Sequence, residues 1–197
     1  MKQIDICIFG DSVTYAGYIK DSWANQLRWY LESKSGAEYH LFNLGINANT
    51  STDILKRFDV EAAARNPNLI IFAVGMNDSA FLIDTKEPIT ELEVFKANLE
   101  ELINKAKEHT NDITFIGLAL GDDSLLKPYP ESSRGKSYDV ARVKQFDHAI
   151  KEIADNNLCK YIEIFKYLEF ADFSDGLHPN ESGHKKIYEV IQQVFKI

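Results

Sequence analysis

Short apolar segments alternate with segments of helical periodicity along the whole chain, and this alternation limits the possible folds more than any other feature of the sequence. The apolar segments have the length of β-strands, and the segments between them repeat apolar residues as an amphipathic helix does. Five strands are expected, at residues 4–9, 39–44, 69–74, 113–120 and 158–164. Strands that alternate with helices pair in parallel through right-handed crossovers. The pattern therefore predicts a three-layer, doubly wound α/β fold with a five-stranded parallel sheet.

Five helices are expected to accompany these strands. Their apolar stripes are centred on Leu27, Phe58, Leu99, Phe146 and Ile187. Thr90 and Glu93 have the spacing of a capping box before the third helix, and Pro67 follows the second helix. The alternation continues without a repeat or a linker. We therefore expect one domain over residues 1–197.

Composition and charge exclude several classes of function. The chain has 22 lysine and arginine residues against 30 aspartate and glutamate residues, which gives a net charge of −8. This charge would repel a phosphate backbone or an anionic lipid surface, so neither nucleic acid nor a membrane is expected as a partner. Cys7 and Cys159 fall in apolar segments and are expected to be buried thiols. The first apolar run is too short for a signal sequence, which predicts a cytoplasmic location.

Ligands of doubly wound sheets bind outside the carboxyl ends of the strands, and polar residues follow several of the predicted strands. Ser12 comes directly after the first strand, and Asp175 and His178 follow the fifth. A serine hydroxyl becomes a useful nucleophile when a histidine takes its proton. The spacing Asp175-x-x-His178 allows the carboxylate to fold back onto one imidazole nitrogen and fix its tautomer. The sequence thus predicts a Ser12-His178-Asp175 triad, with Asp11 expected to stabilise the turn that precedes Ser12.

Three groups could donate hydrogen bonds to the oxyanion of a tetrahedral intermediate. They are the backbone N–H of Ser12, the backbone N–H of Gly45 after the second strand, and the side-chain amide of Asn77 after the third strand. In a flavodoxin-like strand order of 2-1-3-4-5, the second, first and third strands are neighbours. The three donors are therefore expected to converge on one site.

These residues together resemble the four sequence blocks of the SGNH hydrolases, also called GDSL esterases/lipases. The blocks, in the order of the family, are Gly10-Asp11-Ser12, Gly45, Gly75-x-Asn77-Asp78 and Asp175-x-x-His178. The resemblance spans essentially the whole chain. Val13 stands where the family name has leucine, and Ile46-Asn47 follow Gly45 in place of a second glycine.

The resemblance implies the SGNH hydrolase fold and a role for each matched residue. Ser12 would be the nucleophile and first oxyanion donor, Gly45 and Asn77 the other donors, His178 the base and Asp175 its orienting carboxylate. No cofactor and no metal is implied. His184 could suggest a metal pair with His178, but no third ligand has a suitable spacing, and we expect it in the first turn of the last helix. The remaining histidines, His40, His109 and His148, are expected to lack partners.

We therefore predict a serine esterase that hydrolyses a small carboxylic ester, with a short acyl chain and a polar alcohol such as an acetylated carbohydrate or metabolite. Residues 121–137 are mostly polar and are expected to form the substrate rim, whereas Phe81, Leu82 and Ile83 could line an apolar acyl slot. Two alternatives stay open. One is an acyltransferase with the same triad, and the other is a non-catalytic, flavodoxin-like binding domain. The expected partner is a small-molecule ester, and the sequence does not indicate an oligomeric state.

Overall fold

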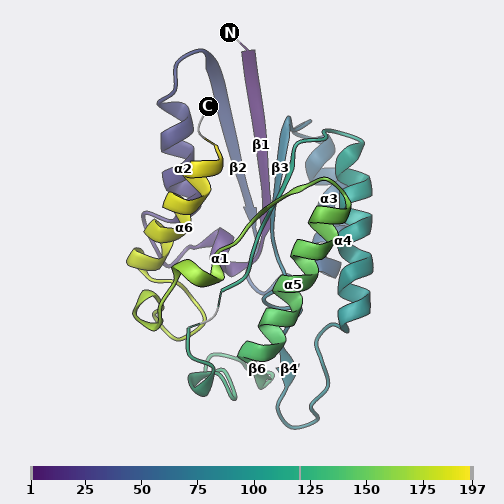
Figure 1. The fold of residues 1–197 in the computed structure, drawn as a ribbon, viewed down its shortest axis with the longest axis vertical. Coiled ribbons are helices and arrows are strands. Elements are labelled where there is room, and N and C mark those ends of the chain that lie inside the picture. The colour runs from purple at the N-terminus through teal and green to yellow at the C-terminus, as the bar shows by residue number, and fades with distance from the viewer. Residues whose placement is uncertain (1, 120, 196–197) are drawn as a thin grey trace.

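A five-stranded parallel sheet forms the centre of the molecule (Figure 1). The structure is a computed structural model that describes residues 2–119 and 121–195. The strands of this sheet are β1 (Lys2–Gly10), β2 (Ala37–Gly45), β3 (Leu69–Ala73), β5 (Ile113–Ile116) and β7 (Lys160–Ile162). They lie in the order β2-β1-β3-β5-β7, and each neighbouring pair is parallel. Numbered within this sheet alone, the order is 2-1-3-4-5, so the predicted fold class is confirmed.

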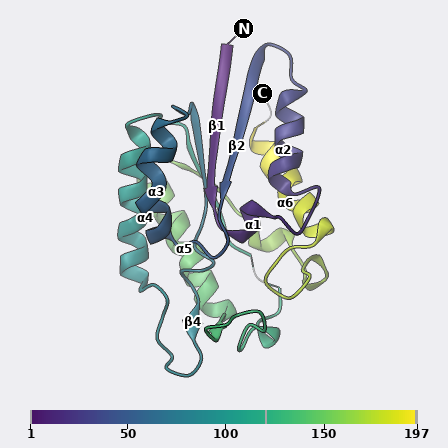
Figure 2. The same ribbon diagram turned by 180° about the vertical axis from the view of Figure 1, so that it is seen from behind.

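Helices cover both faces of the sheet (Figures 1 and 2). Helices α3 (Ser51–Ala63), α4 (Leu92–Lys107) and α5 (Val140–Asn156) lie on one face, and α2 (Trp23–Glu32) and α6 (Glu181–Val194) lie on the other. The short helix α1 (Ser12–Tyr15) follows β1 directly. All five predicted apolar stripes fall within α2 to α6, so each of these helices exists because one of its faces can be buried against the sheet.

Successive residues of β1 enter different cores, because side chains alternate between the faces of a strand. Cys7 and Phe9 pack against α3 and α4, whereas Ile6 and Ile8 pack against α2 and α6. Both faces of the sheet are therefore apolar, as expected of a central parallel strand. Both cysteines are buried and free, as predicted.

Two predicted strands are longer in the sequence pattern than in the structure. The strand expected at 113–120 ends at Ile116. Two residues later, the N–H of Leu118 donates to a side chain, Asp147 Oδ1 of α5, at 2.8 Å, and no longer to a neighbouring strand. Leu120 lies outside the described residues. The strand expected at 158–164 is reduced to β7, since Leu158 has a φ of 59° and is exposed.

The capping box predicted at Thr90 and Glu93 is wrong. Helix α4 begins at Leu92 with Glu91 as its N-cap residue, and no side chain caps it. Thr90 is buried instead, with its side chain beside the carboxyl group of Asp78. Capping boxes are found instead at Thr50 and Asp53, before α3, and at Glu169 and Asp172, in a 3-10 turn.

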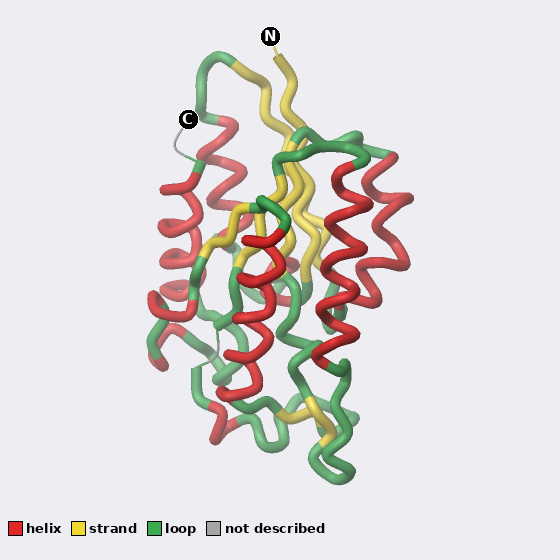
Figure 3. The backbone as a smooth tube through the Cα atoms, turned by 45° about the vertical axis from the view of Figure 1, so that its right-hand side comes forward, coloured by secondary structure: helices red, strands yellow, loops and turns green. Residues whose placement is uncertain are grey.

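The loops that follow the strands gather at the lower end of the molecule in Figures 1 and 3. A two-stranded antiparallel ribbon of β4 (Phe81–Leu82) and β6 (Lys136–Ser137) lies there as well, with Leu82 opposite Lys136. Short 3-10 turns at Asp123–Leu125, Phe165–Tyr167 and Phe170–Asp172 complete this end. No helix within residues 2–119 and 121–195 is long and apolar enough to cross a membrane.

Candidate active site

Ser12 stands at the carboxyl end of β1, as the first residue of α1. Asp11 caps this helix, because its Oδ1 accepts the N–H of Val13 at 3.0 Å, which is the turn-stabilising role predicted for it. The Ser12 hydroxyl is partly exposed, and its Oγ lies 3.0 Å from His178 Nε2. Two residues that are 166 positions apart in the chain are thus in hydrogen-bond contact.

A tight turn joins Asp175 to His178. Asp175 Oδ1 accepts the backbone N–H groups of Leu177 at 2.9 Å and of His178 at 2.7 Å. Its other oxygen, Oδ2, lies 2.8 Å from His178 Nδ1. Gly176 adopts a φ of 87° within the turn, a conformation that favours glycine. These local contacts bring the carboxylate and the imidazole together, and a distant one supports the turn, since the N–H of Gly121 donates to Gly176 O at 2.9 Å.

Tyr129 is a third partner of this pair, and the sequence reasoning missed it. Its hydroxyl donates to Asp175 Oδ2 at 3.0 Å and lies 3.4 Å from His178 Nδ1. Burial, together with the bond to Asp175, raises the pKa of Tyr129, so the phenol stays protonated and can donate. The polar character of residues 121–137 predicted a rim but did not single out this side chain.

These contacts determine the protonation state of the site. Partial burial alone would raise the pKa of Asp175, but the hydrogen bonds from the His178 ring and from two backbone N–H groups outweigh it and hold that pKa far below its usual value. Asp175 is therefore a carboxylate at neutral pH, and it accepts the Nδ1 proton of His178. In this tautomer, Nε2 carries a lone pair directed at the Ser12 hydroxyl, and it can take the serine proton.

Gly45 does not occupy the position predicted for an oxyanion donor. Its N–H donates to Asn43 Oδ1 at 3.0 Å, and the residue does not line the cleft around Ser12. A Cβ at this position would come within 2.3 Å of Tyr15 N, so the glycine allows β2 to approach α1 closely. The prediction for Gly45 is wrong because the sequence pattern did not show this close contact.

Ala48, three residues further along, lines the cleft with Ser12. Its φ of 61° is unusual for a residue with a Cβ and turns the local backbone sharply. Among the described residues, no acceptor is found for the N–H of Ala48 or for that of Ser12. Glycine is the residue that most readily adopts such a φ. The lack of a second glycine after Gly45 was therefore the available sign in the sequence that the backbone path of this block departs from the family pattern.

Asn77 lines the same cleft, and its amide group is oriented by its neighbours. Asn77 Oδ1 accepts from Lys136 Nζ at 3.3 Å and from the Tyr138 hydroxyl at 3.4 Å. Nδ2 donates one hydrogen to Asn49 O at 3.3 Å, which leaves its second hydrogen available. The loop itself is anchored by the buried Asp78, which accepts the N–H and the hydroxyl of Ser51.

The cleft that contains these groups has a volume of about 860 Å³. Besides Ser12, Ala48, Asn77, Asp175 and His178, its lining comprises Tyr18, Ile19, Asn47, Tyr129, Glu131, Ser132, Ser133, Arg134, Lys136, Tyr138, Ser174 and Leu177. Most of these are polar or aromatic with a polar tip. Phe81, Leu82 and Ile83 are not among its lining residues; Phe81 and Leu82 form β4, which pairs with β6. The expected rim at 121–137 thus contacts the cleft, and the alternative of an apolar slot at Phe81–Ile83 has no support.

His184 lies in the first turn of α6 as predicted and is completely buried. Its Nδ1 accepts the backbone N–H of Trp23 at 3.3 Å, so we assign its proton to Nε2, which lies 3.1 Å from the Tyr18 hydroxyl. Burial lowers the pKa of His184 to about 4, which keeps the ring neutral. Tyr18 also presents its ring edge-on to His178, with centroids 5.3 Å apart. No cluster of metal-ligating side chains occurs in the described part of the chain.

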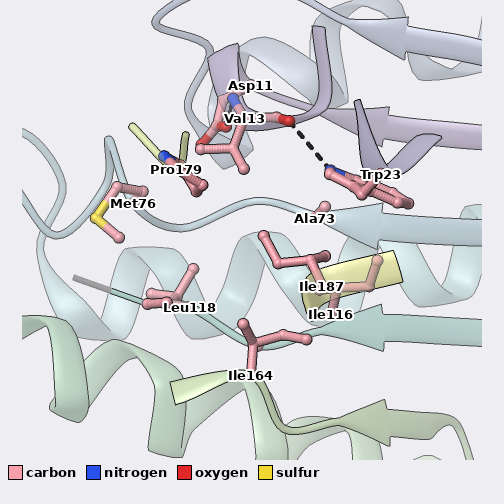
Figure 4. Close-up of a pocket in the computed structure, with 12 residues that line it drawn as sticks. Asp11, Val13, Trp23, Ala73, Met76, Ile116, Leu118, Ile164, Pro179 and Ile187 are labelled. Atoms are coloured by element: carbon pink, nitrogen blue, oxygen red, sulfur yellow. Dashed lines mark hydrogen bonds between the residues drawn. The ribbon is translucent and has the colours of Figure 1, made fainter. Parts of the chain in front are cut away.

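A second, smaller pocket of about 50 Å³ lies on the α2–α6 side of the sheet (Figure 4). Apart from Asp11, its labelled lining is apolar, with Val13, Trp23, Met76 and Ile187 among its members. Burial against this lining raises the pKa of Asp11 to about 6, despite the hydrogen bond from Val13. Ser12 and His178 do not border this pocket. It therefore isolates the Asp11 carboxyl group from water behind the site.

The prediction that His40 lacks partners is wrong. His40 does have partners, since its Nδ1 lies 3.0 Å from Asp5 Oδ1 and its Nε2 lies 3.3 Å from Glu38 Oε1. Both carboxylates belong to β1 and β2, and the parallel register that places Asp5 opposite His40 could not be read from either segment alone.

Comparison with known proteins agrees with this geometry. Residues 8–186 match the GDSL-like Lipase/Acylhydrolase family. The chain belongs to this family. The predicted SGNH resemblance is thus confirmed, and the family is one of enzymes that hydrolyse carboxylic esters.

Two individual proteins are similar to parts of this chain at low sequence identity. An acetylxylan esterase of Geobacillus stearothermophilus is 25% identical over 155 residues, which are 72% of this chain and 65% of that protein. A lipoprotein of Bacillus subtilis (strain 168), YqeF, is 28% identical over 112 residues, which are 53% of this chain and 44% of the lipoprotein. The match therefore spans less than two thirds of the length of either relative.

Solved structures share the fold over nearly the whole chain. The acetylxylan esterase Axe2 of Geobacillus stearothermophilus has a TM-score of 0.76 at 17% identity, over 98% of this chain and 94% of its own. TesA has a TM-score of 0.76 at 18% identity, over 98% of both chains. At these identities the comparison establishes a common fold.

Proposed function

We propose that this protein is a serine esterase that hydrolyses a small carboxylic ester through an acyl-enzyme on Ser12. The observation that carries the proposal is the continuous chain of contacts from Ser12 Oγ to His178 Nε2, at 3.0 Å, and from His178 Nδ1 to Asp175 Oδ2, at 2.8 Å. These contacts lie in a cleft large enough for a small substrate, and the family consists of ester hydrolases.

In the first half of the reaction, Ser12 Oγ attacks the ester carbonyl while His178 Nε2 takes the hydroxyl proton. The tetrahedral intermediate collapses, the carbon–oxygen bond to the alcohol breaks, and the imidazolium returns its proton to the leaving alcohol. In the second half, His178 takes a proton from water, the resulting hydroxide attacks the acyl-enzyme, and Ser12 leaves with the proton. Asp175 stabilises the imidazolium in both halves.

The oxyanion is proposed to bind three N–H donors that line the cleft. They are the backbone N–H of Ser12, the backbone N–H of Ala48 in place of Gly45, and the Nδ2 of Asn77. Two observations support this set: the two backbone groups have no acceptor in the described structure, and Asn77 has a hydrogen to spare. Such preorganised donors usually provide the largest part of the rate enhancement.

The proposed substrate is a small ester with a short acyl chain and a polar alcohol, in the class of acetylated carbohydrates. Most residues that line the cleft carry a hydroxyl, amide or charged group, although apolar atoms, including the rings of Tyr18, Tyr129 and Tyr138, form more of its surface than polar atoms do. It offers no long apolar slot within the described residues. The similarity to an acetylxylan esterase supports the same class. We infer that residues 1–197 act as one catalytic domain, since the family match runs unbroken from 8 to 186. A cytoplasmic location stays a prediction, because one relative is a lipoprotein.

The experiment that tests this function is product analysis on acetyl, butyryl and decanoyl esters of one alcohol, with wild-type protein and with Ser12→Ala. We expect the acetyl ester to have the highest kcat/KM and Ser12→Ala to lose turnover while keeping its fold. Preference for the decanoyl ester would contradict the short acyl chain. Addition of a second alcohol distinguishes the acyltransferase, which would transfer the acyl group to that alcohol rather than to water. Absence of turnover with every ester would favour the non-catalytic binding domain.

A further inference from the structure

Two cationic side chains of the segment between β5 and α5 line the cleft without a carboxylate partner. Lys136 and Arg134 both border the cleft, and among the described residues neither forms an ion pair. Lys127, in the same segment, differs from them, since it pairs with Asp123 and Asp139 at 2.8 and 2.9 Å. Carboxylates of the described residues thus neutralise Lys127, whereas Lys136 and Arg134, which border the cleft, stay without an ion pair there.

Lys136 is partly buried, which makes its free charge costly. Burial, reinforced by the neighbouring Arg134 charge, lowers the pKa of Lys136. The only polar contact of its Nζ in the described structure is Asn77 Oδ1, at 3.3 Å. The carboxylates of Asp78, Asp11 and Asp53 offset part of this effect, but none of them forms an ion pair with Lys136 in the described structure. An anion close to Lys136 and Arg134 would relieve both the desolvation and the repulsion.

The position of this pair is defined by the fold. Lys136 belongs to β6, where Leu82 of β4 pairs with it, and its backbone N–H donates to Ser132 Oγ at 2.9 Å. Its ammonium group therefore stands next to the proposed oxyanion donor Asn77. Glu131 also borders the cleft, but it is exposed and forms no ion pair with either cation in the described structure.

We propose that Lys136 and Arg134 form an anion-binding subsite, and that the ester substrate carries a carboxylate group which this subsite binds. The inference rests on the proposed esterase function and specifies its substrate class. Arginine offers a planar fork that matches a carboxylate, and lysine adds a compact charge. The net charge of −8 disfavours anions over the molecule as a whole, so an anionic substrate needs such a local cationic pair in order to bind.

The test compares matched pairs of esters that differ by one negative charge. For the alcohol half we would use 4-acetoxybenzoate and its methyl ester, and for the acyl half monoethyl succinate and ethyl pentanoate. In wild-type protein we expect kcat/KM for the anionic member of one pair to exceed that of its neutral partner by about tenfold or more, and the ratio to fall as ionic strength rises. The pair that shows the preference identifies the half of the ester that bears the carboxylate.

Lys136→Met and Arg134→Gln are each expected to bring this ratio close to one. Lys136→Met also disturbs Asn77, so its effect is read from the ratio between the two esters, not from either rate alone. Lys151→Gln, on the outer surface of α5, is the matched control and should leave the ratio unchanged. A ratio of one or less in both wild-type pairs, or a ratio that survives both substitutions, would overturn the proposal.

Equilibrium binding separates this inference from the proposed function. Calorimetric titration of succinate into Ser12→Ala needs no turnover, and Arg134→Gln in that background should weaken binding about tenfold. Arg134 is exposed, so this variant is expected to fold even if Lys136→Met does not. Binding without ester turnover would retain the subsite and reject the esterase, whereas turnover of neutral esters without succinate binding would do the reverse.

Discussion

The polar residues at the ends of the strands and the segment from 121 to 139 line the same cleft, but different interactions hold them in place. Asp175 is fixed locally by accepting the backbone N–H groups two and three residues ahead. Asp11, which lies behind the cleft and caps the helix that begins with Ser12, accepts the N–H two residues ahead. The segment 121–139 is fixed by distant parts of the chain. Its β6 pairs with β4, and Tyr129 contacts Asp175 across 46 positions.

We infer from this difference that the residues at the strand ends carry out the reaction and that the segment 121–139 selects the substrate. Local turns at the ends of parallel strands place Ser12 and the Asp175-His178 pair at the mouth of the sheet. The Asn77 amide depends on both regions, since Lys136 and Tyr138 orient it. The longer segment contributes Tyr129, Arg134 and Lys136 to the lining of the same cleft. We therefore expect substitutions at the strand ends to reduce kcat strongly, and substitutions in the segment to change rates moderately and to alter substrate preference.

The largest effect is expected from Asp175→Asn, which should lower kcat by up to about 10⁴-fold, because an amide stabilises neither the reactive tautomer nor the imidazolium. The amide oxygen can still accept the N–H groups of Leu177 and His178, so the turn should persist. Steady-state kinetics on an acetyl ester, with circular dichroism as the control for folding, measure this. A loss of less than tenfold would mean that another group orients His178.

Asn77→Ala should cost roughly 10²–10³ in kcat with little change in KM, since an oxyanion donor acts mainly on the transition state. Asn77 is 6% exposed and its amide contacts Lys136 and Tyr138, so the unfolding transition of the variant should be recorded beside its kinetics. A pure increase in KM would reassign Asn77 to substrate binding.

In the segment, Tyr129→Phe should lower kcat/KM by about tenfold, the effect of losing one hydrogen bond to a charged group. Loss of this donor would leave Asp175 less firmly oriented towards His178, which lowers the rate. It would also leave the negative charge of Asp175 less neutralised, so the acid limb of the kcat/KM profile should move to higher pH. Tyr167→Phe, on an exposed 3-10 turn, serves as the control. A lower rate with an unmoved profile would assign Tyr129 a packing role only.

The smallest effect concerns stability at the end of β1. Asp11 has a pKa raised to about 6 by burial, against 3.8 in an unfolded chain. The folded state therefore binds more protons between these values, and ionisation of Asp11 destabilises the fold as the pH rises through about 6. Asp11→Asn, which can still cap α1, should raise the free energy of unfolding at pH 7 by about 1–2 kcal/mol, and this gain should shrink towards pH 4. Urea unfolding at both pH values tests it, and a variant less stable at pH 7 would contradict it.

The parts that could be predicted from the sequence are those determined by short-range patterns. Strand and helix periodicity was enough for a doubly wound parallel sheet, whereas the strand order was expected by analogy with flavodoxin-like folds. The spacing from Asp175 to His178 was enough for their contact. Gly45 was assigned wrongly because its N–H is taken by Asn43, a contact that depends on the path of the backbone after β2. Tyr129 and Lys136 were missed because their partners are 46 and 59 positions away, and no local pattern encodes such distances.

The central claim is that His178 activates Ser12 as a nucleophile, and covalent labelling with a short-chain alkyl fluorophosphonate tests it most directly. Intact-mass and peptide analysis should show one adduct per chain, on Ser12, with no adduct in Ser12→Ala and much slower labelling in His178→Ala. An adduct on Ser132 or Ser133, which also line the cleft, or undiminished labelling of Ser12→Ala, would contradict the account.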